Sequence, residues 1–150
     1  MPSSILVFLF ACGTSLVHAI LEIQIEGPNG WAKALPTKKF TGWIARNLTE
    51  VGYITGFHAA TLAFIALLAH FPVLFVSDWT WQRESVVLGF LFFHFTFEDF
   101  LWFVFNPAYG IAKFKKQHIW WHRHWIFGLP ASYWPGIILG LVFLFIAGAA

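Results

Sequence analysis

Four long apolar runs, separated by stretches that hold nearly all of the charged residues, dominate the chain. They lie near residues 4–21, 55–76, 85–105 and 132–149. Each approaches the roughly 20 residues that an α-helix needs to cross about 30 Å of hydrocarbon. The pattern predicts an all-α fold, an integral membrane four-helix bundle, with residues 1–150 forming a single membrane domain.

Composition supports this prediction. Charged residues make up 11% of the chain, whereas hydrophobic residues reach 59% and aromatic residues 21%. An ordinary soluble domain has about 25% charged residues. The lipid bilayer is therefore the expected partner, and a net charge of +2 is too small to indicate nucleic acid. The lone Cys12 cannot form an internal disulfide.

The basic residues predict an orientation. Eight of the nine lie in two connections, before the second run and before the fourth, and only Arg83 lies elsewhere: Lys33, Lys38, Lys39, Arg46, Lys113, Lys115, Lys116 and Arg123. Under the positive-inside rule both connections are cytoplasmic. The termini and the short link between the second and third runs are then expected outside.

The first run has a second interpretation as a signal peptide. Val17-His18-Ala19 satisfies the small-residue rule for a cleavage site. No Lys or Arg precedes the run, so we expect a retained span.

The first connection is expected to lie on the membrane surface. A strong turn signal at residues 27–30 is followed by Trp31, Phe40 and Trp43 among basic residues. Two interpretations remain open, an amphipathic collar around the bundle and a lid over a site.

Proline and glycine mark the end of the third helix and the packing of the fourth. Asn106-Pro107 bars helix continuation, which would turn the chain back toward Glu98. Gly136, Gly140 and Gly148 would allow close helix approach in a fourth helix without ionisable groups.

Histidines and carboxylates in apolar surroundings are the candidate functional residues, because ionisable groups at membrane depth are costly. Under the predicted topology, parts of three helices and both basic connections carry them to the cytoplasmic face. Spacings of four place His18, Glu22 and Glu26 on one face if the first helix continues, and likewise pair His94 with Glu98 and His118 with His122. Imidazole and carboxylate are ligands for iron and zinc. The predicted metal ligands are His94, Glu98, His118, His122, His58, His18 and Glu22.

Structural roles are the alternative for the same residues. The histidines at residues 118–124 could form an interfacial belt, and Glu22 and Glu26 could pair with Lys33 or Lys38. The adjacent acids Glu98 and Asp99 could pair with Arg123 or Lys113. We otherwise expect Glu98 and Asp99 to act as ligand or general base.

His70 belongs to a different hypothesis. It lies twelve residues, about 18 Å, beyond His58 on one helix, so the two cannot share an ion. His70 and His94 fall at comparable depth in neighbouring helices. They could be axial ligands of a b-type haem.

The segments His94-Phe95-Thr96-Phe97-Glu98 and His118-Ile119-Trp120-Trp121-His122-Arg123-His124 resemble the integral-membrane histidine-box enzymes of the desaturase and hydroxylase type. The resemblance implies a transition metal at the cytoplasmic membrane face. The chain departs from that family in having no His-His doublet.

Three functions follow from these observations. The leading hypothesis is a membrane metalloenzyme, an oxidoreductase or hydrolase, that uses iron or zinc to activate oxygen or water on a lipid-like or other apolar small molecule. The second is electron transfer through haem b. The third is a non-catalytic subunit packed against other membrane subunits.

Overall fold

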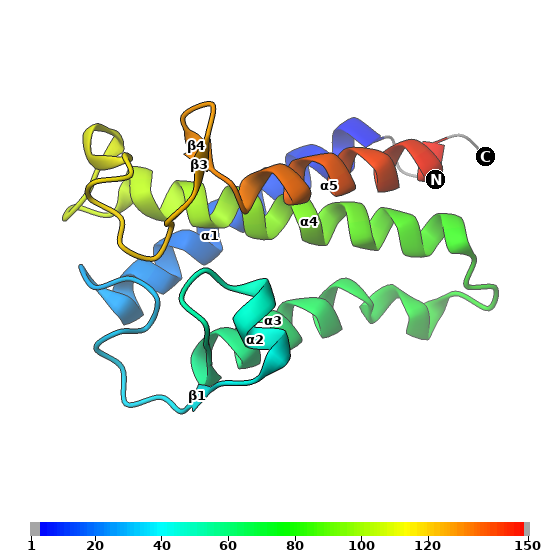
Figure 1. The fold of residues 1–150 in the computed structure, drawn as a ribbon. Coiled ribbons are helices and arrows are strands. Elements are labelled where there is room, and N and C mark those ends of the chain that lie inside the picture. Colours follow the sequence, from blue (N-terminus) through cyan, green and yellow to red (C-terminus); the bar gives the residue numbers. More distant parts are fainter. Residues whose placement is uncertain (1–3, 149–150) are drawn as a thin grey trace.

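The computed structural model describes residues 4–148, which are mostly helical (Figure 1). The α-helices are α1 (Ser4–Glu26), α2 (Trp43–Leu48), α3 (Gly56–Ala69), α4 (Trp81–Phe105) and α5 (Tyr133–Gly148). Two 3₁₀ segments follow α3 and α4, namely η1 (Phe71–Phe75) and η2 (Ile111–Lys113). The prediction of an all-α fold omitted two short antiparallel pairs, β1 (Lys39–Phe40) with β2 (Ile54–Thr55) and β3 (Trp125–Ile126) with β4 (Leu129–Pro130).

Three of the predicted spans form apolar helices long enough to cross a membrane: Ile5–Glu26, Gly56–Phe75 and Trp81–Phe105. The fourth run forms α5, whose 16 residues extend about 24 Å. That length falls short of a hydrocarbon core of about 30 Å. Residue 149, the predicted end of the fourth run, lies outside the described residues.

Helix α4 is the centre of the packing, with α1 and α5 against it (Figure 1). The glycines of α5 allow this approach. A Cβ atom at Gly136 would lie 2.0 Å from Thr96 Oγ1, and one at Gly140 would lie 3.0 Å from the Phe93 ring. The predicted role of these two glycines in close helix packing is therefore confirmed.

Helix α3 packs differently, since none of its residues is buried. Apolar side chains such as Leu62, Phe64, Leu67 and Leu68 are exposed along it. Such a continuous apolar surface suits contact with lipid. Beyond η1 the chain turns and enters α4 (Figure 1).

The carboxyl ends of α1 and α4 are tied together. Helix α4 ends at Phe105, directly before Asn106-Pro107, as predicted. The Asn106 side-chain amide then donates a 2.8 Å hydrogen bond to the Gly27 carbonyl just after α1. This link holds the last turns of the two helices side by side.

Candidate metal centre

Helix α1 continues to Glu26, so the predicted shared face of His18, Glu22 and Glu26 is confirmed. The three residues are buried, with exposed fractions of 8%, 7% and 5%. Two buried carboxyl groups one turn apart therefore face the same neighbours.

His58, in the first turn of α3, completes this group. Its Nε2 atom lies 3.7 Å from Glu22 Oε1 and 3.6 Å from Glu26 Oε1. One ligand atom from each of these residues lies within 4.8 Å of the others. We call Glu22, Glu26 and His58 the metal triad.

Thr55 orients the His58 ring. Its Oγ1 atom lies 2.6 Å from His58 Nδ1 and accepts a hydrogen bond from the His58 backbone N–H, capping α3. A ring nitrogen held by an outer partner is the usual way to aim the other nitrogen at a metal. Here the aimed nitrogen is Nε2, which faces the carboxylates.

The first connection covers the metal triad. The Trp31 ring stacks on His58 with centroids 4.5 Å apart, and the backbone N–H of Ala32 donates to Glu26 Oε1. Gly30, Trp31 and Ala32 have positive φ angles of 49°, 53° and 47°. Since left-handed backbone is costly for residues other than glycine, this turn is maintained by its contacts. The arrangement agrees with the lid interpretation.

Glu98 brings a third carboxyl group to the site. It lies beside Glu22, and Glu98 Oε1 is buried without a hydrogen-bond partner. Within residues 4–148, no Lys or Arg forms an ion pair with Glu22, Glu26 or Glu98. The predicted pairing of Glu22 or Glu26 with Lys33 or Lys38 is not found, because these lysines lie over the rings of Trp120 and Phe40.

His94 points away from its helical neighbour Glu98 and toward α1. Its Nε2 atom lies 3.0 Å from His18 Nδ1, and its Nδ1 atom lies 3.1 Å from Thr14 Oγ1. Both ring nitrogens of His94 are therefore occupied. The free imidazole atom is His18 Nε2, which is buried without a partner.

Asp99 belongs to a neighbouring group. Its Oδ2 atom lies 2.9 Å from His122 Nε2 and accepts a 2.5 Å hydrogen bond from the Tyr133 hydroxyl. Within residues 4–148, no ion pair joins Glu98 or Asp99 to the predicted partners Arg123 and Lys113, and Lys113 Nζ donates instead to the Ala108 carbonyl.

His118 is exposed, unlike the buried histidines and carboxylates of the site. The segment from residue 114 to residue 124 contains no helix. The four-residue spacing of His118 and His122 therefore does not place them on a shared helical face. Of these two histidines, His122 contacts a carboxylate, that of the half-buried Asp99.

The haem hypothesis requires His70 and His94 to face one iron, and the structure does not bring them together. His70 Nδ1 lies 2.7 Å from the Ala66 carbonyl, and its Nε2 lies 3.2 Å from Glu84 Oε1. His94 follows Glu84 by ten residues, about 15 Å along α4. The two histidines thus lie at different depths.

The link between η1 and α4 carries an ion pair beside His70. Arg83 Nη1 lies 2.9 Å from Asp78 Oδ1. Hydrogen bonding and attraction from the Arg83 guanidinium hold the pKa of the Asp78 carboxyl below its ordinary value.

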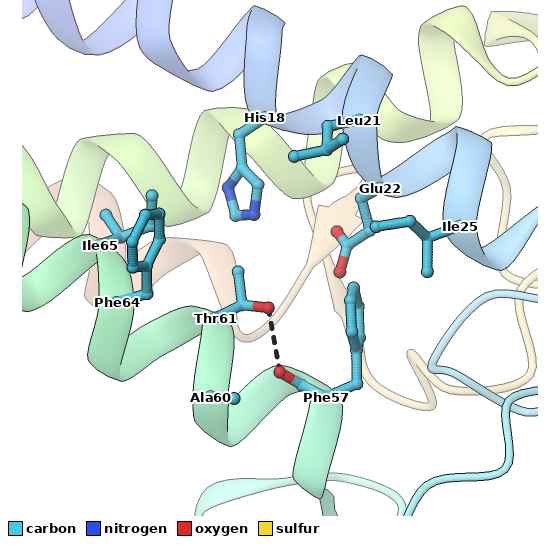
Figure 2. A pocket seen from close by; sticks show the side chains of 9 residues that line it. All are labelled: His18, Leu21, Glu22, Ile25, Phe57, Ala60, Thr61, Phe64 and Ile65. Carbon is cyan, nitrogen blue, oxygen red and sulfur yellow. Dashed lines mark hydrogen bonds between the residues drawn. The ribbon is translucent and has the colours of Figure 1, made fainter.

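A cavity of about 290 Å³ lies between α1 and α3 beside the metal triad. Figure 2 shows His18 and Glu22 on one wall, with the side chains of α3 opposite them. Its lining residues are His18, Leu21, Glu22, Ile25, Phe57, Ala60, Thr61, Phe64 and Ile65. An apolar cavity with a few convergent polar groups is the usual form of a small-molecule site.

Sequence reasoning left out two residues that the structure places at the centre. Glu26 was expected to be an ordinary charge at a helix exit, although its four-residue spacing from Glu22 was the available signal. Trp31 was expected in the first connection on the membrane surface, as part of either a collar or a lid, with no named partner. No spacing rule links Trp31 to His58, because the intervening loop sets their contact.

Comparisons with protein-family models, curated proteins and solved structures found no match. The resemblance to histidine-box enzymes stays a prediction.

Proposed function

We propose that this chain is a membrane metalloprotein in which Glu22, Glu26 and His58 hold a transition metal ion, iron or zinc. The spacing of the metal triad is the observation that supports this most directly. Nitrogen and oxygen ligands lie about 2.0–2.2 Å from zinc, so two ligands of one ion lie about 3–4 Å apart. The His58–Glu22 and His58–Glu26 separations of 3.7 and 3.6 Å fall in this range.

Charge balance supports a bound cation. Glu22, Glu26 and Glu98 are buried with exposed fractions of 7%, 5% and 6%. Buried carboxylates require a cation or a proton to offset their loss of water. With no Lys or Arg paired to them in residues 4–148, a divalent metal is the partner that this donor set fits.

We further propose that the protein is an enzyme acting on an apolar small molecule. The bound metal would supply Lewis-acid polarisation or activation of water or oxygen. Thr55 aims His58, and Trp31 shields the metal triad from water. Glu98, which lies beside Glu22 and has no partner at Oε1, is placed to accept or hold a proton. Asp99, held by His122 and Tyr133, has a positioning role.

The substrate would enter from the bilayer, because the cavity is lined by apolar side chains of α1 and α3. With both basic connections cytoplasmic under the positive-inside rule, the site would open on the cytoplasmic leaflet.

Elemental analysis of protein purified in lipid nanodiscs tests the metal site. We expect about one transition metal per chain, and a decrease of at least about tenfold in Glu22→Gln and in Glu26→Gln, which keep side-chain shape but remove a charged ligand. Glu84→Gln, a carboxylate bound to His70 in the same chain, is the matched control and should retain metal. Full metal content in both ligand variants would rule out the proposed centre.

A further inference from the structure

The cavity between α1 and α3 has an unused polar atom on its wall. His18 is 8% exposed, lines the cavity, and has a buried Nε2 atom without a hydrogen-bond partner. A buried imidazole nitrogen left unpaired costs free energy unless a ligand satisfies it. Figure 2 shows the ring projecting from α1 toward α3.

We infer that this cavity binds an apolar alcohol, whose hydroxyl group donates a hydrogen bond to His18 Nε2. The inference rests on the proposed function, since the same wall carries Glu22 of the metal triad, and it specifies the substrate class.

The hydrogen bonds behind His18 indicate that its Nε2 atom is an acceptor. The Thr14 hydroxyl is directed at the carbonyls of Phe10 and Ala11, at 3.0 and 3.1 Å, and the Ser15 hydroxyl at those of Ala11 and His94, at 2.6 and 2.9 Å. A hydroxyl group has one hydrogen to donate.

Because the Thr14 hydroxyl proton is directed at a backbone carbonyl, the proton in the Thr14–His94 hydrogen bond comes from the His94 ring. His94 Nδ1–H donates to Thr14 Oγ1, so His94 Nε2 accepts from His18 Nδ1–H. A neutral imidazole has one N–H. His18 Nε2 is left as a lone pair facing the cavity.

The other polar groups of the cavity wall also favour a neutral ligand that donates a hydrogen bond. Glu22 offers only acceptor atoms when ionised. The Thr61 hydroxyl, which could have donated, is bound to the Phe57 carbonyl at 2.9 Å (Figure 2). No lining residue is a Lys or Arg. The side chains that line the cavity therefore offer no cationic partner to a fatty acid or phosphate headgroup.

The rest of the lining suits a hydrocarbon body. Phe57, Phe64 and Ile65 of α3 face Leu21 and Ile25 of α1 across the cavity. Leu21, Ile25 and Phe64 are 56%, 43% and 59% exposed, so an apolar chain could extend past them into lipid. The hydroxyl is then positioned between His18 and the metal triad.

Photolabelling in nanodiscs tests this inference with four probes that share one diazirine-bearing chain: an alcohol, its methyl ether, the fatty acid and the primary amine. Peptide mapping would measure labelling of residues 21–25 and 57–65. One hydrogen bond of about 1 kcal/mol predicts about fivefold more labelling by the alcohol than by the ether. Preference for the ether, acid or amine, or equal labelling by alcohol and ether, would overturn the inference.

Two substitutions at His18 separate the hydrogen bond from folding. His18→Asn keeps a group near the Nδ1 position for His94 but removes Nε2, so it should reduce the alcohol-to-ether labelling ratio to about one. His18→Gln retains a polar group near the Nε2 position and should keep part of the preference. His70→Gln, which removes an imidazole at the other end of the same span and outside the cavity, is the control and should leave the ratio unchanged. An undiminished ratio in His18→Asn would overturn the inference.

Metal content measured on the same samples separates the two proposals. A metal-loaded protein without alcohol preference would refute only the alcohol. A metal-free protein with a His18-dependent preference would refute only the metal centre.

Discussion

The span formed by α3 and η1 has a histidine beside carboxylate groups near each end, His58 at the start of α3 and His70 where η1 begins. The two histidines differ in how their charge is balanced. At the η1 end, His70 binds Glu84 through Nε2 and the Ala66 carbonyl through Nδ1, and Glu84 Oε2 accepts from Trp79 Nε1. At the other end, His58 faces Glu22 and Glu26, and Glu98 lies beside Glu22.

The difference is one of balance and burial. The His70 and Glu84 side chains are 36% and 24% exposed and form a matched pair. At the metal triad the Glu26 side chain is only 3% exposed, and several acids share one imidazole. The same residue types thus form an ordinary partly exposed ion pair at one end and a group that lacks positive charge at the other. Residue type alone does not distinguish the two ends. They are distinguished by the surplus of buried carboxylate acceptors at the metal triad.

Metal removal should distinguish the two ends most clearly. Metal at about 100 times its dissociation constant stabilises a folded state by about 2.7 kcal/mol, which corresponds to about 5–10 °C in Tm for a chain of this size. Chelation should therefore lower the Tm of the wild type and of Glu84→Gln by this amount, but leave Glu26→Gln unchanged. An equal chelator effect in Glu26→Gln and the wild type would contradict the difference.

Gly30→Ala should disturb only the covered end. A Cβ atom there would lie 2.3 Å from the Trp121 ring, at a φ angle of +49°. Backbone strain and overpacking together predict a loss of about 2–4 kcal/mol, with faster metal release to chelator as the cover over His58 loosens. Denaturant unfolding and stopped-flow chelation would measure both.

Gly27→Ala is the control for Gly30→Ala. It has a φ of +61° but nothing within 4 Å of the added Cβ, so only the backbone cost of about 1–2 kcal/mol is expected. Metal release from Gly27→Ala as fast as from Gly30→Ala would show that the Trp121 contact does not secure the cover.

Glu84→Gln should have a small effect at the balanced end. Partly exposed ion pairs contribute about 0–1 kcal/mol, so thermal unfolding should show at most that loss. Loss of bound metal from this variant would contradict the assignment of the site to the opposite end.

The smallest effect is expected at Asp78, which pairs with Arg83 near His70. The folded-state pKa of Asp78 lies below its ordinary value of about 3.9. Its contribution to stability is therefore present above that value and is lost as pH falls through the folded-state pKa. The Tm difference between wild type and Asp78→Asn should shrink below about pH 4. A difference that grows on acidification would contradict the pairing.

The helices could be predicted from the sequence because apolar run length and proline position act locally. The continuous face of His18, Glu22 and Glu26 also follows from helical spacing alone. The approach of His58 to this face needed only that the first connection return the chain to the same membrane side.

The remaining partners depend on side-chain direction and loop path, which spacing does not encode. His94 turned toward His18 rather than toward Glu98, and the non-helical course of residues 114–124 left His118 exposed. Asp99 found Tyr133 at the start of α5, where sequence reasoning offered only lysine and arginine. The Trp31–His58 stack depends on a left-handed turn over residues 30–32 that no apolar pattern predicts.

The most direct test of the central claim compares His58→Gln with His70→Gln. Both substitutions remove an imidazole that faces a carboxylate, one at each end of the same span. Elemental analysis should find at least about tenfold less bound metal per chain in His58→Gln than in the wild type. The metal content of His70→Gln should match that of the wild type. Equal metal content in all three proteins, or loss only in His70→Gln, would contradict the assignment of Glu22, Glu26 and His58 as the metal centre.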